Sequence, residues 1–93
     1  MDPFTDERNI VHINVKQRNG RKCITTISGI SYKMDLHKII RYLKKSINTN
    51  GAVIQTNDFG DIIQLQGDVR NEVYTRLIDW NIVDKEDIRI HGA

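Results

Sequence analysis

The sequence has little of several residue types, and each shortage excludes a class of protein. A single cysteine, Cys23, in 93 residues excludes an internal disulfide and a cysteine-rich zinc site, which favours a reducing, cytoplasmic environment. The single proline and the 39% of hydrophobic residues do not match the composition of a disordered chain. No apolar run approaches the roughly 20 residues of a membrane-spanning helix. His12, His37 and His91 lack metal-ligand spacing, so we expect no metal site and no cofactor.

The first nine residues predict a short acidic tail that precedes the folded part. Residues 1–7 contain acidic side chains and no basic one, which differs from the basic start and apolar core of an export signal. A chain of 93 residues is long enough for one domain, because a smaller unit would bury too little apolar surface to fold alone. We therefore expect a tail over residues 1–9 and a single domain over residues 10–93.

Charge is distributed unevenly along the chain, although the formal net charge is only +2. Between Arg8 and Lys45 there are ten basic residues and one acidic residue, Asp35. From Ser46 onward, eight acidic residues accompany four basic ones. Such an asymmetry indicates a protein that turns one side toward a polyanion and another toward solvent or a protein partner.

The chain is predicted to open with a β-hairpin that has a basic tip. Residues 10–16 alternate between apolar and polar side chains, and residues 23–30 are rich in β-branched side chains. Between them, Asn19-Gly20 favours a type I′ turn, since both residues tolerate positive φ. Three cations flank this turn, and a rigid arm that carries them suits contacts to phosphate; the alternative is a solvated turn whose charge serves only solubility. These cations are Arg18, Arg21 and Lys22.

A helix with a basic face follows the hairpin. Asp35 is the predicted N-cap, and Gly51 is the predicted left-handed C-cap. Lysines on such a helix are more often only solvent-facing than part of an RNA or acidic-protein surface, but here they share the basic half of the sequence with the hairpin tip. The apolar stripe consists of Leu36, Ile39, Ile40, Leu43 and Ile47, and the basic face of Lys38, Arg41, Lys44 and Lys45.

The remaining residues predict a second hairpin, a second helix and a last strand. Strands over residues 52–55 and 62–66 are joined by a polar turn, and residues 88–91 form a short strand. Asp68 is the predicted N-cap of the second helix. The order ββαββαβ predicts an α+β fold, a two-layer sandwich in which two helices cover one face of a five-stranded mixed sheet. The apolar stripe of the second helix consists of Val69, Val73, Leu77 and Trp80.

Catalysis has little support in the residues. Cys23 is predicted in the middle of a strand and His12 on the neighbouring strand, and no nucleophile elbow or phosphate-binding loop surrounds them. A structural cysteine and a surface histidine are the simpler interpretation. The chain also lacks the interleaved aromatics of a single-strand stacking platform, which favours contacts to the backbone and shape of a nucleic acid over base reading.

Two long strings carry a resemblance to a known family, QRNGRK at residues 17–22 and IIQLQGD at residues 62–68. With shorter strings they run in order from about residue 10 to residue 92. The sequence resembles the family of eukaryotic translation initiation factor one, the suppressor-of-initiator-codon family. Its abundant Ile, Asn and Lys are typical of an A/T-rich genome, as in a protist or large virus. The shorter strings are Val11-His12-Ile13, Thr25-Thr26, Gly29-Ile30, Asp35-Leu36, Lys44-Lys45, Asn50-Gly51 and Ile90-His91-Gly92.

The resemblance implies a cytoplasmic, monomeric, non-enzymatic factor without a membrane partner. It implies binding to the small ribosomal subunit near the P site, support of scanning, and opposition to initiation at wrong codons, with other initiation factors as further partners. Contacts to ribosomal RNA are implied for Arg18, Asn19, Gly20, Arg21, Lys22, Lys38, Arg41, Lys44 and Lys45. A turn facing the initiator tRNA is implied for Thr56, Asn57, Asp58, Phe59 and Gly60, in which the Asp58 charge would repel a phosphate backbone.

The sequence also departs from this family. The acidic leader is shorter than usual, Thr49 replaces a cysteine, Val69 replaces a glutamine, and Ala93 replaces an aromatic terminus. These changes affect the contacts expected with partners, whereas the two long strings remain. The alternative function is a protein-interaction module whose basic helix binds other initiation factors and which has no role of its own in codon selection.

Overall fold

The computed structural model describes residues 10–18, 20–31, 33–58 and 60–92. Within these residues it contains five strands and two α-helices in the order ββαββαβ, so the predicted α+β class is confirmed. The predicted tail over residues 1–9 lies outside the described residues. The elements are β1 (Val11–Gln17), β2 (Cys23–Ser28), α1 (Leu36–Ile47), β3 (Gly51–Thr56), β4 (Gly60–Gln66), α2 (Arg70–Asp79), the short 3₁₀ helix η2 (Lys85–Asp87) and β5 (Ile88–Ile90).

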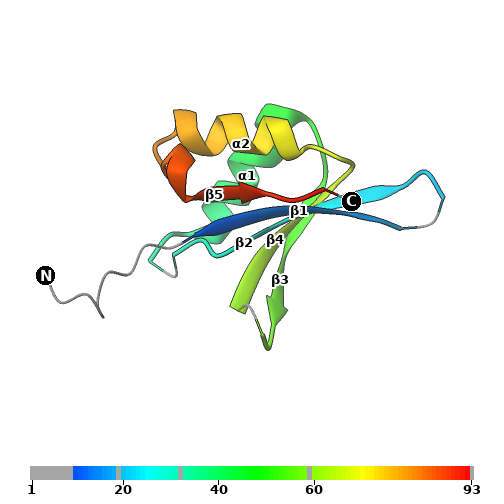
Figure 1. Ribbon diagram of the computed structural model, residues 1–93, viewed down its shortest axis with the longest axis horizontal. Helices are drawn as coiled ribbons and strands as arrows, with labels where there is room; N and C mark the ends of the chain where they lie inside the picture. Colours follow the sequence, from blue (N-terminus) through cyan, green and yellow to red (C-terminus); the bar gives the residue numbers. More distant parts are fainter. Residues whose placement is uncertain (1–9, 19, 32, 59, 93) are drawn as a thin grey trace, which may run out of the picture.

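The five strands form one mixed sheet with the order β3-β4-β2-β1-β5. Neighbouring strands are antiparallel, except that β5 runs parallel to β1. Both helices lie on the same face of this sheet, α1 against β3 and β4 and α2 against β1 (Figure 1). The predicted two-layer sandwich is therefore confirmed. Neither described helix has the length and apolar character that crossing a membrane requires.

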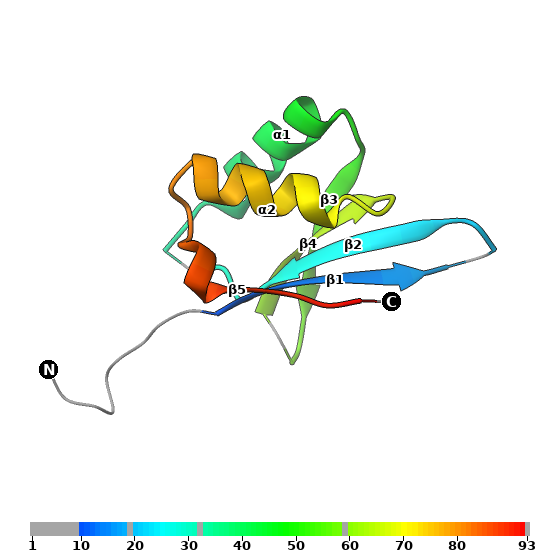
Figure 2. The same ribbon diagram turned by 45° about the horizontal axis from the view of Figure 1, so that its top comes forward.

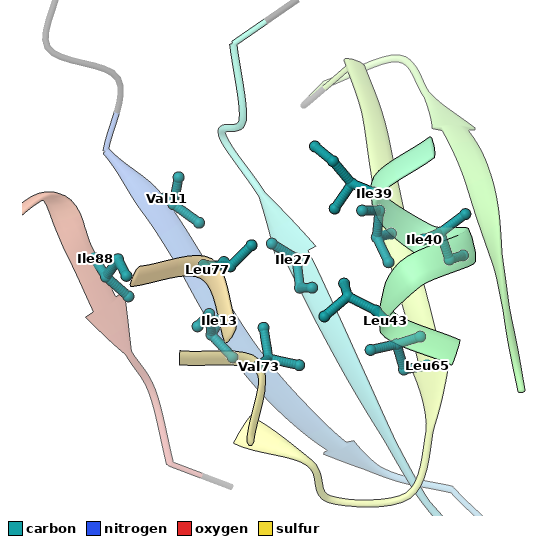
Figure 3. Close-up of a cluster of buried hydrophobic side chains, with 11 residues drawn as sticks. Val11, Ile13, Ile27, Ile39, Ile40, Leu43, Leu65, Val73, Leu77 and Ile88 are labelled. Atoms are coloured by element: carbon teal, nitrogen blue, oxygen red, sulfur yellow. The ribbon is translucent and has the colours of Figure 1, made fainter. Parts of the chain in front are cut away.

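The hydrophobic core fills the space between the sheet and the two helices (Figure 3). Every second residue of β1 points into it, since successive side chains of a strand face opposite sides. Val11 and Ile13 are thus buried, whereas His12 lies on the other side of the strand. Leu43 of α1 and Leu77 of α2 are fully buried. This packing fixes which face of the sheet remains uncovered.

Both ends of α1 are capped, and the predicted N-cap is confirmed. The Asp35 carboxylate accepts a hydrogen bond from the Lys38 backbone N–H at 3.2 Å. The predicted C-cap, Gly51, was wrong, because Asn48 has the left-handed conformation with φ 61° and donates its backbone N–H to the Lys44 carbonyl. Gly51 instead begins β3, where a Cβ atom would meet the backbone carbonyl of Gln64.

The start of α2 also differs from the prediction. Val69 is the N-cap residue and makes no side-chain capping bond, while Asp68 lies one residue outside the helix boundary. The Asp68 carboxylate binds the Arg70 guanidinium through two hydrogen bonds of 2.8 Å. These hydrogen bonds hold the pKa of the Asp68 carboxyl below its usual value. The carboxylate that was expected to cap α2 therefore forms an ion pair with Arg70, the first residue of the helix.

Several other predicted boundaries were displaced by one or two residues. The first strand is Val11–Gln17 instead of residues 10–16, and β2 ends at Ser28 instead of residue 30 because Gly29 has a φ of 87°. Trp80 ends α2 and is 36% exposed, so it does not extend the buried stripe. The second hairpin has longer strands than predicted, with β3 over Gly51–Thr56 and β4 over Gly60–Gln66, and β5 ends at Ile90.

Candidate nucleic-acid interface

The β1–β2 hairpin extends beyond the rest of the sheet and beyond both helices (Figures 1 and 2). Its antiparallel register runs continuously from His12 opposite Ser28 to Gln17 opposite Cys23. The hairpin is therefore a regular two-stranded arm whose outer end is free of the helix layer. Such an arm carries its tip into solvent with a fixed direction.

The turn at this tip has a different geometry from the predicted one. The Arg18 backbone N–H donates to the Lys22 carbonyl at 2.6 Å, which pairs these two residues and leaves three positions between them. A type I′ turn at Asn19-Gly20 would leave two positions and pair Arg18 with Arg21, so this turn type was wrong. Gly20 has a φ of 64° and its carbonyl accepts a hydrogen bond from the Gln17 side chain. Asn19 lies outside the described residues.

Three cations surround this turn and are available to a partner. The residues Arg18, Arg21 and Lys22 are all exposed. None of them forms an ion pair with any described residue. Because both Arg and Lys keep their charge at neutral pH, the tip presents a concentrated positive charge. Phosphate oxygens are the ligands that this arrangement suits, since Arg can donate two parallel hydrogen bonds to them.

The basic face of α1 is a second positive surface. Its four cations, Lys38, Arg41, Lys44 and Lys45, are exposed. The carboxyl end of α1 leads to Gly51, which is opposite Leu65, and Leu65 is opposite Thr25 near the start of β2. The last turn of α1 therefore lies at the end of the sheet from which the hairpin arm projects. Lys44 and Lys45 share this end, whereas Lys38 belongs to the first turn of the helix.

The second predicted site lies at the opposite end of the sheet. Strand β2 is antiparallel to both β1 and β4, so the turn before β4 is remote from the β1–β2 turn. The Thr56 hydroxyl donates to the Gly60 carbonyl at 2.6 Å, which closes this turn, and Gly60 has a φ of 69°. Asn57 and Asp58 are exposed, and Phe59 lies outside the described residues. The two predicted contact regions are thus separate surfaces.

An apolar hollow between the two helices was not predicted. It has a volume of about 420 Å³ and is bordered by the basic face of α1. Tyr42 and Trp80 meet there edge to face, with ring centroids 6.1 Å apart. Tyr42 belongs to α1 and Trp80 directly follows α2, so no single segment of the sequence contains this hollow. The only indication was Trp80 at the end of the apolar stripe predicted for the second helix. The lining residues are Lys38, Ile39, Tyr42, Trp80 and Ile82.

The structure separates the two residues considered for catalysis. Cys23 begins β2, whereas His12 is opposite Ser28 at the other end of that strand, about 16 Å away along the chain direction. His12 instead contacts His91, with Nδ1 and Nε2 3.0 Å apart. Among the described residues, no group of three or more potential ligands is arranged to hold a metal ion. The thiol and the imidazole therefore do not form a nucleophile and base pair.

Comparisons with known proteins agree with this fold. The family model for translation initiation factor SUI1 matches residues 7–83. The chain is 44% identical over 100 residues to a protein translation factor SUI1 homolog of Brassica oleracea, an alignment that covers 98% of this chain and 88% of the plant protein. It is 42% identical over 98 residues to the protein translation factor SUI1 of Eremothecium gossypii, covering 98% and 91%.

A solved structure shares the arrangement of strands and helices. The crystal structure of the C-terminal domain of human eIF2D superimposes with a TM-score of 0.79 over 89% of this chain, at 16% sequence identity. The chain spans 43% of that human chain. At this identity the likeness shows a common fold and no more.

Proposed function

We propose, because this chain belongs to the translation initiation factor SUI1 family, that it binds the small ribosomal subunit near the P site and acts in start-codon selection during scanning. The observation that carries this proposal is the exposed cationic tip at the end of the β1–β2 arm, whose cations form no ion pair with a described residue. The site of action is the cytoplasm, and the initiator tRNA region and other initiation factors are the further partners. No bond is made or broken in this role.

The arm binds ribosomal RNA through phosphate contacts. Its regular pairing limits the conformational freedom lost on binding, so less of the interaction energy is spent on ordering the tip. Arg18, Arg21 and Lys22 neutralise phosphates and release condensed counterions. Lys44 and Lys45 add positive charge at the same end of the sheet. Binding of this kind depends on shape and charge and is weakened by salt.

The second turn opposes tRNA from the other end of the sheet. Asp58 is exposed there, and its carboxylate repels the phosphates of a tRNA that moves fully into the P site. A correctly paired anticodon supplies enough free energy to overcome this repulsion, whereas a mismatched one does not. Discrimination between codons follows from this difference.

Removing this charge tests the discrimination step. We expect Asp58→Asn to raise initiation at a near-cognate codon about fivefold relative to AUG, because repulsion between exposed charges contributes about 1 kcal/mol. The measurement is a reconstituted initiation assay that compares AUG with UUG, with the wild-type protein, the variant or neither. Asp79→Asn, the same change on the exposed surface of α2, is the control and should leave the ratio unchanged. If the wild-type protein left the ratio of UUG to AUG initiation as it is in the reaction without either protein, the proposed function would be contradicted.

A second function is favoured by the hollow beside the basic face of α1. An apolar hollow lined by Lys38, which forms no ion pair with a described residue, suits an acidic protein segment that carries a large apolar side chain, as in a module that only binds other initiation factors. The pair Lys44→Glu and Lys45→Glu separates this alternative from the leading proposal. If both lysines contact RNA, we expect the double variant to bind small subunits at least about tenfold more weakly in a sedimentation assay. Unchanged subunit binding with lost capture of purified initiation factors would favour the protein-interaction module.

A further inference from the structure

One whole face of the sheet is left uncovered by the described residues. Both helices pack on the other face, and the two views in Figures 1 and 2 agree on this arrangement. The strand positions that alternate with the core residues all belong to this open face. They are mostly polar or basic, as on any sheet face in contact with water, so what distinguishes this face is the sign of its charge. The polar and basic ones are His12, Asn14, Lys16, Thr26, Ser28, Thr56, Gln64, Gln66 and Arg89.

The open face has no carboxylate at its described strand positions. The one acidic residue in a described strand is Asp61. It lies on the same side of β4 as Ile63 and Leu65, whose side chains point into the core. The other described acidic residues lie in turns, in loops and in the helix layer. Negative charge is therefore segregated away from this face, which makes it compatible with a polyanion.

A row of three uncharged polar side chains crosses the centre of the face. Asn14 is directly opposite Thr26, and Thr26 is directly opposite Gln64, so the row spans three adjacent strands and about 10 Å. All three residues are half-buried, yet none of their side chains makes a hydrogen bond with any described residue. Side chains in this position that lack an internal partner are available to an external one.

Two cations flank this row, one of them on the side of the hairpin tip. Lys16 lies on the open face two residues before Arg18, and Arg89 is beside His12 on the neighbouring strand. The face is thus continuous with the tip through β1. No Phe, Tyr or Trp lies on a described strand, and the one aromatic ring there, that of His12, is already stacked on His91, so the face does not resemble a stacking platform for a single strand. The apolar residues of the face are Ala52 and Ile54 on the edge strand β3, Ile62 on the next strand β4, and Ile24, which is only 4% exposed.

We propose that the row Asn14, Thr26 and Gln64 binds the shallow minor groove of double-helical RNA, next to the phosphates that the hairpin tip contacts. That groove displays 2′-hydroxyls and base edges, which donate and accept hydrogen bonds as amide and hydroxyl side chains do. The row has both donors and acceptors. The flanking Lys16 reaches phosphate on one side, and Arg89, whose Nη1 donates to the Glu86 and Ile88 carbonyls, adds positive charge on the other. This inference rests on the proposed function and assigns a second RNA contact to it.

The test measures binding of the full chain to a fluorescein-labelled RNA duplex of about 16 base pairs by anisotropy. We expect Asn14→Asp to weaken binding about tenfold, and Gln64→Glu likewise, because each change removes a donor and places a negative charge near phosphate. Asn71→Asp is the matched control, since it makes the same chemical change on the exposed surface of α2. The control should bind as the wild type does.

A second variant checks the 2′-hydroxyl. Thr26→Val keeps the shape of the side chain and removes its hydroxyl, so we expect it to bind the RNA duplex several-fold more weakly. A DNA duplex of the same sequence lacks the 2′-hydroxyl, and we expect the wild type to bind it more weakly than RNA and the variant to reduce this preference. Equal binding of the two duplexes by the wild type would overturn the minor-groove assignment.

Binding to salt-washed small ribosomal subunits distinguishes this inference from the function on which it rests. If Arg21→Glu with Lys22→Glu weakens subunit binding while Asn14→Asp and Gln64→Glu do not, the open-face assignment is wrong and the proposed function stands. If the cationic variant also binds as the wild type does, both fail. Unchanged RNA affinity with concentration-dependent dimerisation that Asn14→Asp abolishes would assign the face to a second copy and likewise overturn the inference.

Discussion

Replacing Arg21 and Lys22 together by glutamate should weaken binding to small ribosomal subunits about a hundredfold, or by about 2.7 kcal/mol. Both side chains are exposed at the end of the β1–β2 arm and are not neutralised by any described carboxylate. Their positive charge is therefore available to a polyanionic partner, and reversal would convert two attractions into two repulsions. The fold should be unaffected, because neither side chain contributes to the core. Sedimentation of the labelled variant with purified subunits gives the affinity.

The dependence of this affinity on salt provides an independent measurement. Each phosphate contact that is lost should lower the slope of log affinity against log salt by about 1, so the double variant should have a slope lower by about 2. The control is Lys33→Glu with Lys85→Glu, which changes the net charge equally at two exposed positions away from the tip. If the control weakened binding as much as the tip variant, attraction would depend on net charge alone and the arm would have no specific role.

Local patterns were sufficient to predict the elements of the fold. The alternation of Val11, Ile13 and Val15 and the stripe that contains Leu43 are properties of a few consecutive residues, and both survived in the structure. The N-cap at Asp35 was predictable for the same reason, since the capping bond spans only three residues. What could not be predicted were features set by distant residues. Val69 caps α2 because the Thr25 hydroxyl accepts its N–H, and Thr25 is 44 residues earlier in the chain.

The candidate site likewise has one part that a short stretch of sequence predicts and other parts that depend on distant residues. The cationic hairpin tip follows from a short string, and only the length of its turn was wrong, because the pairing of Arg18 with Lys22 depends on the register of the whole arm. The open face required knowledge of which strands are neighbours, since Asn14, Thr26 and Gln64 are far apart in sequence. The hollow at Tyr42 and Trp80 required the packing of two helices. Surfaces assembled from several elements have no signature in any single segment.

Thr25 joins the sheet to the start of α2 and is the only polar residue among the fully buried side chains described. Its hydroxyl donates to the Gly67 carbonyl at 2.7 Å and accepts from the Val69 backbone N–H at 2.9 Å. One buried hydroxyl thus satisfies two backbone groups of the loop between β4 and α2. Val69 needs this partner because the helix N-terminus leaves its N–H without an intrahelical acceptor.

Thr25→Val should lower the free energy of unfolding by about 3 kcal/mol and the midpoint of thermal unfolding by about 15 °C. Valine fills the same volume, so the loss comes from two backbone groups left without a hydrogen bond in a buried place. Thr26→Val is the control, because it makes the same change one residue later on the open face, where the hydroxyl has no described partner. Circular dichroism during urea and thermal unfolding measures both variants. Equal stability of the two variants would mean that the hydrogen bonds of the Thr25 hydroxyl do not stabilise the fold. A loss of stability confined to Thr25→Val would show that Thr25 has a structural role, which Thr26, the residue proposed to contact RNA, does not share.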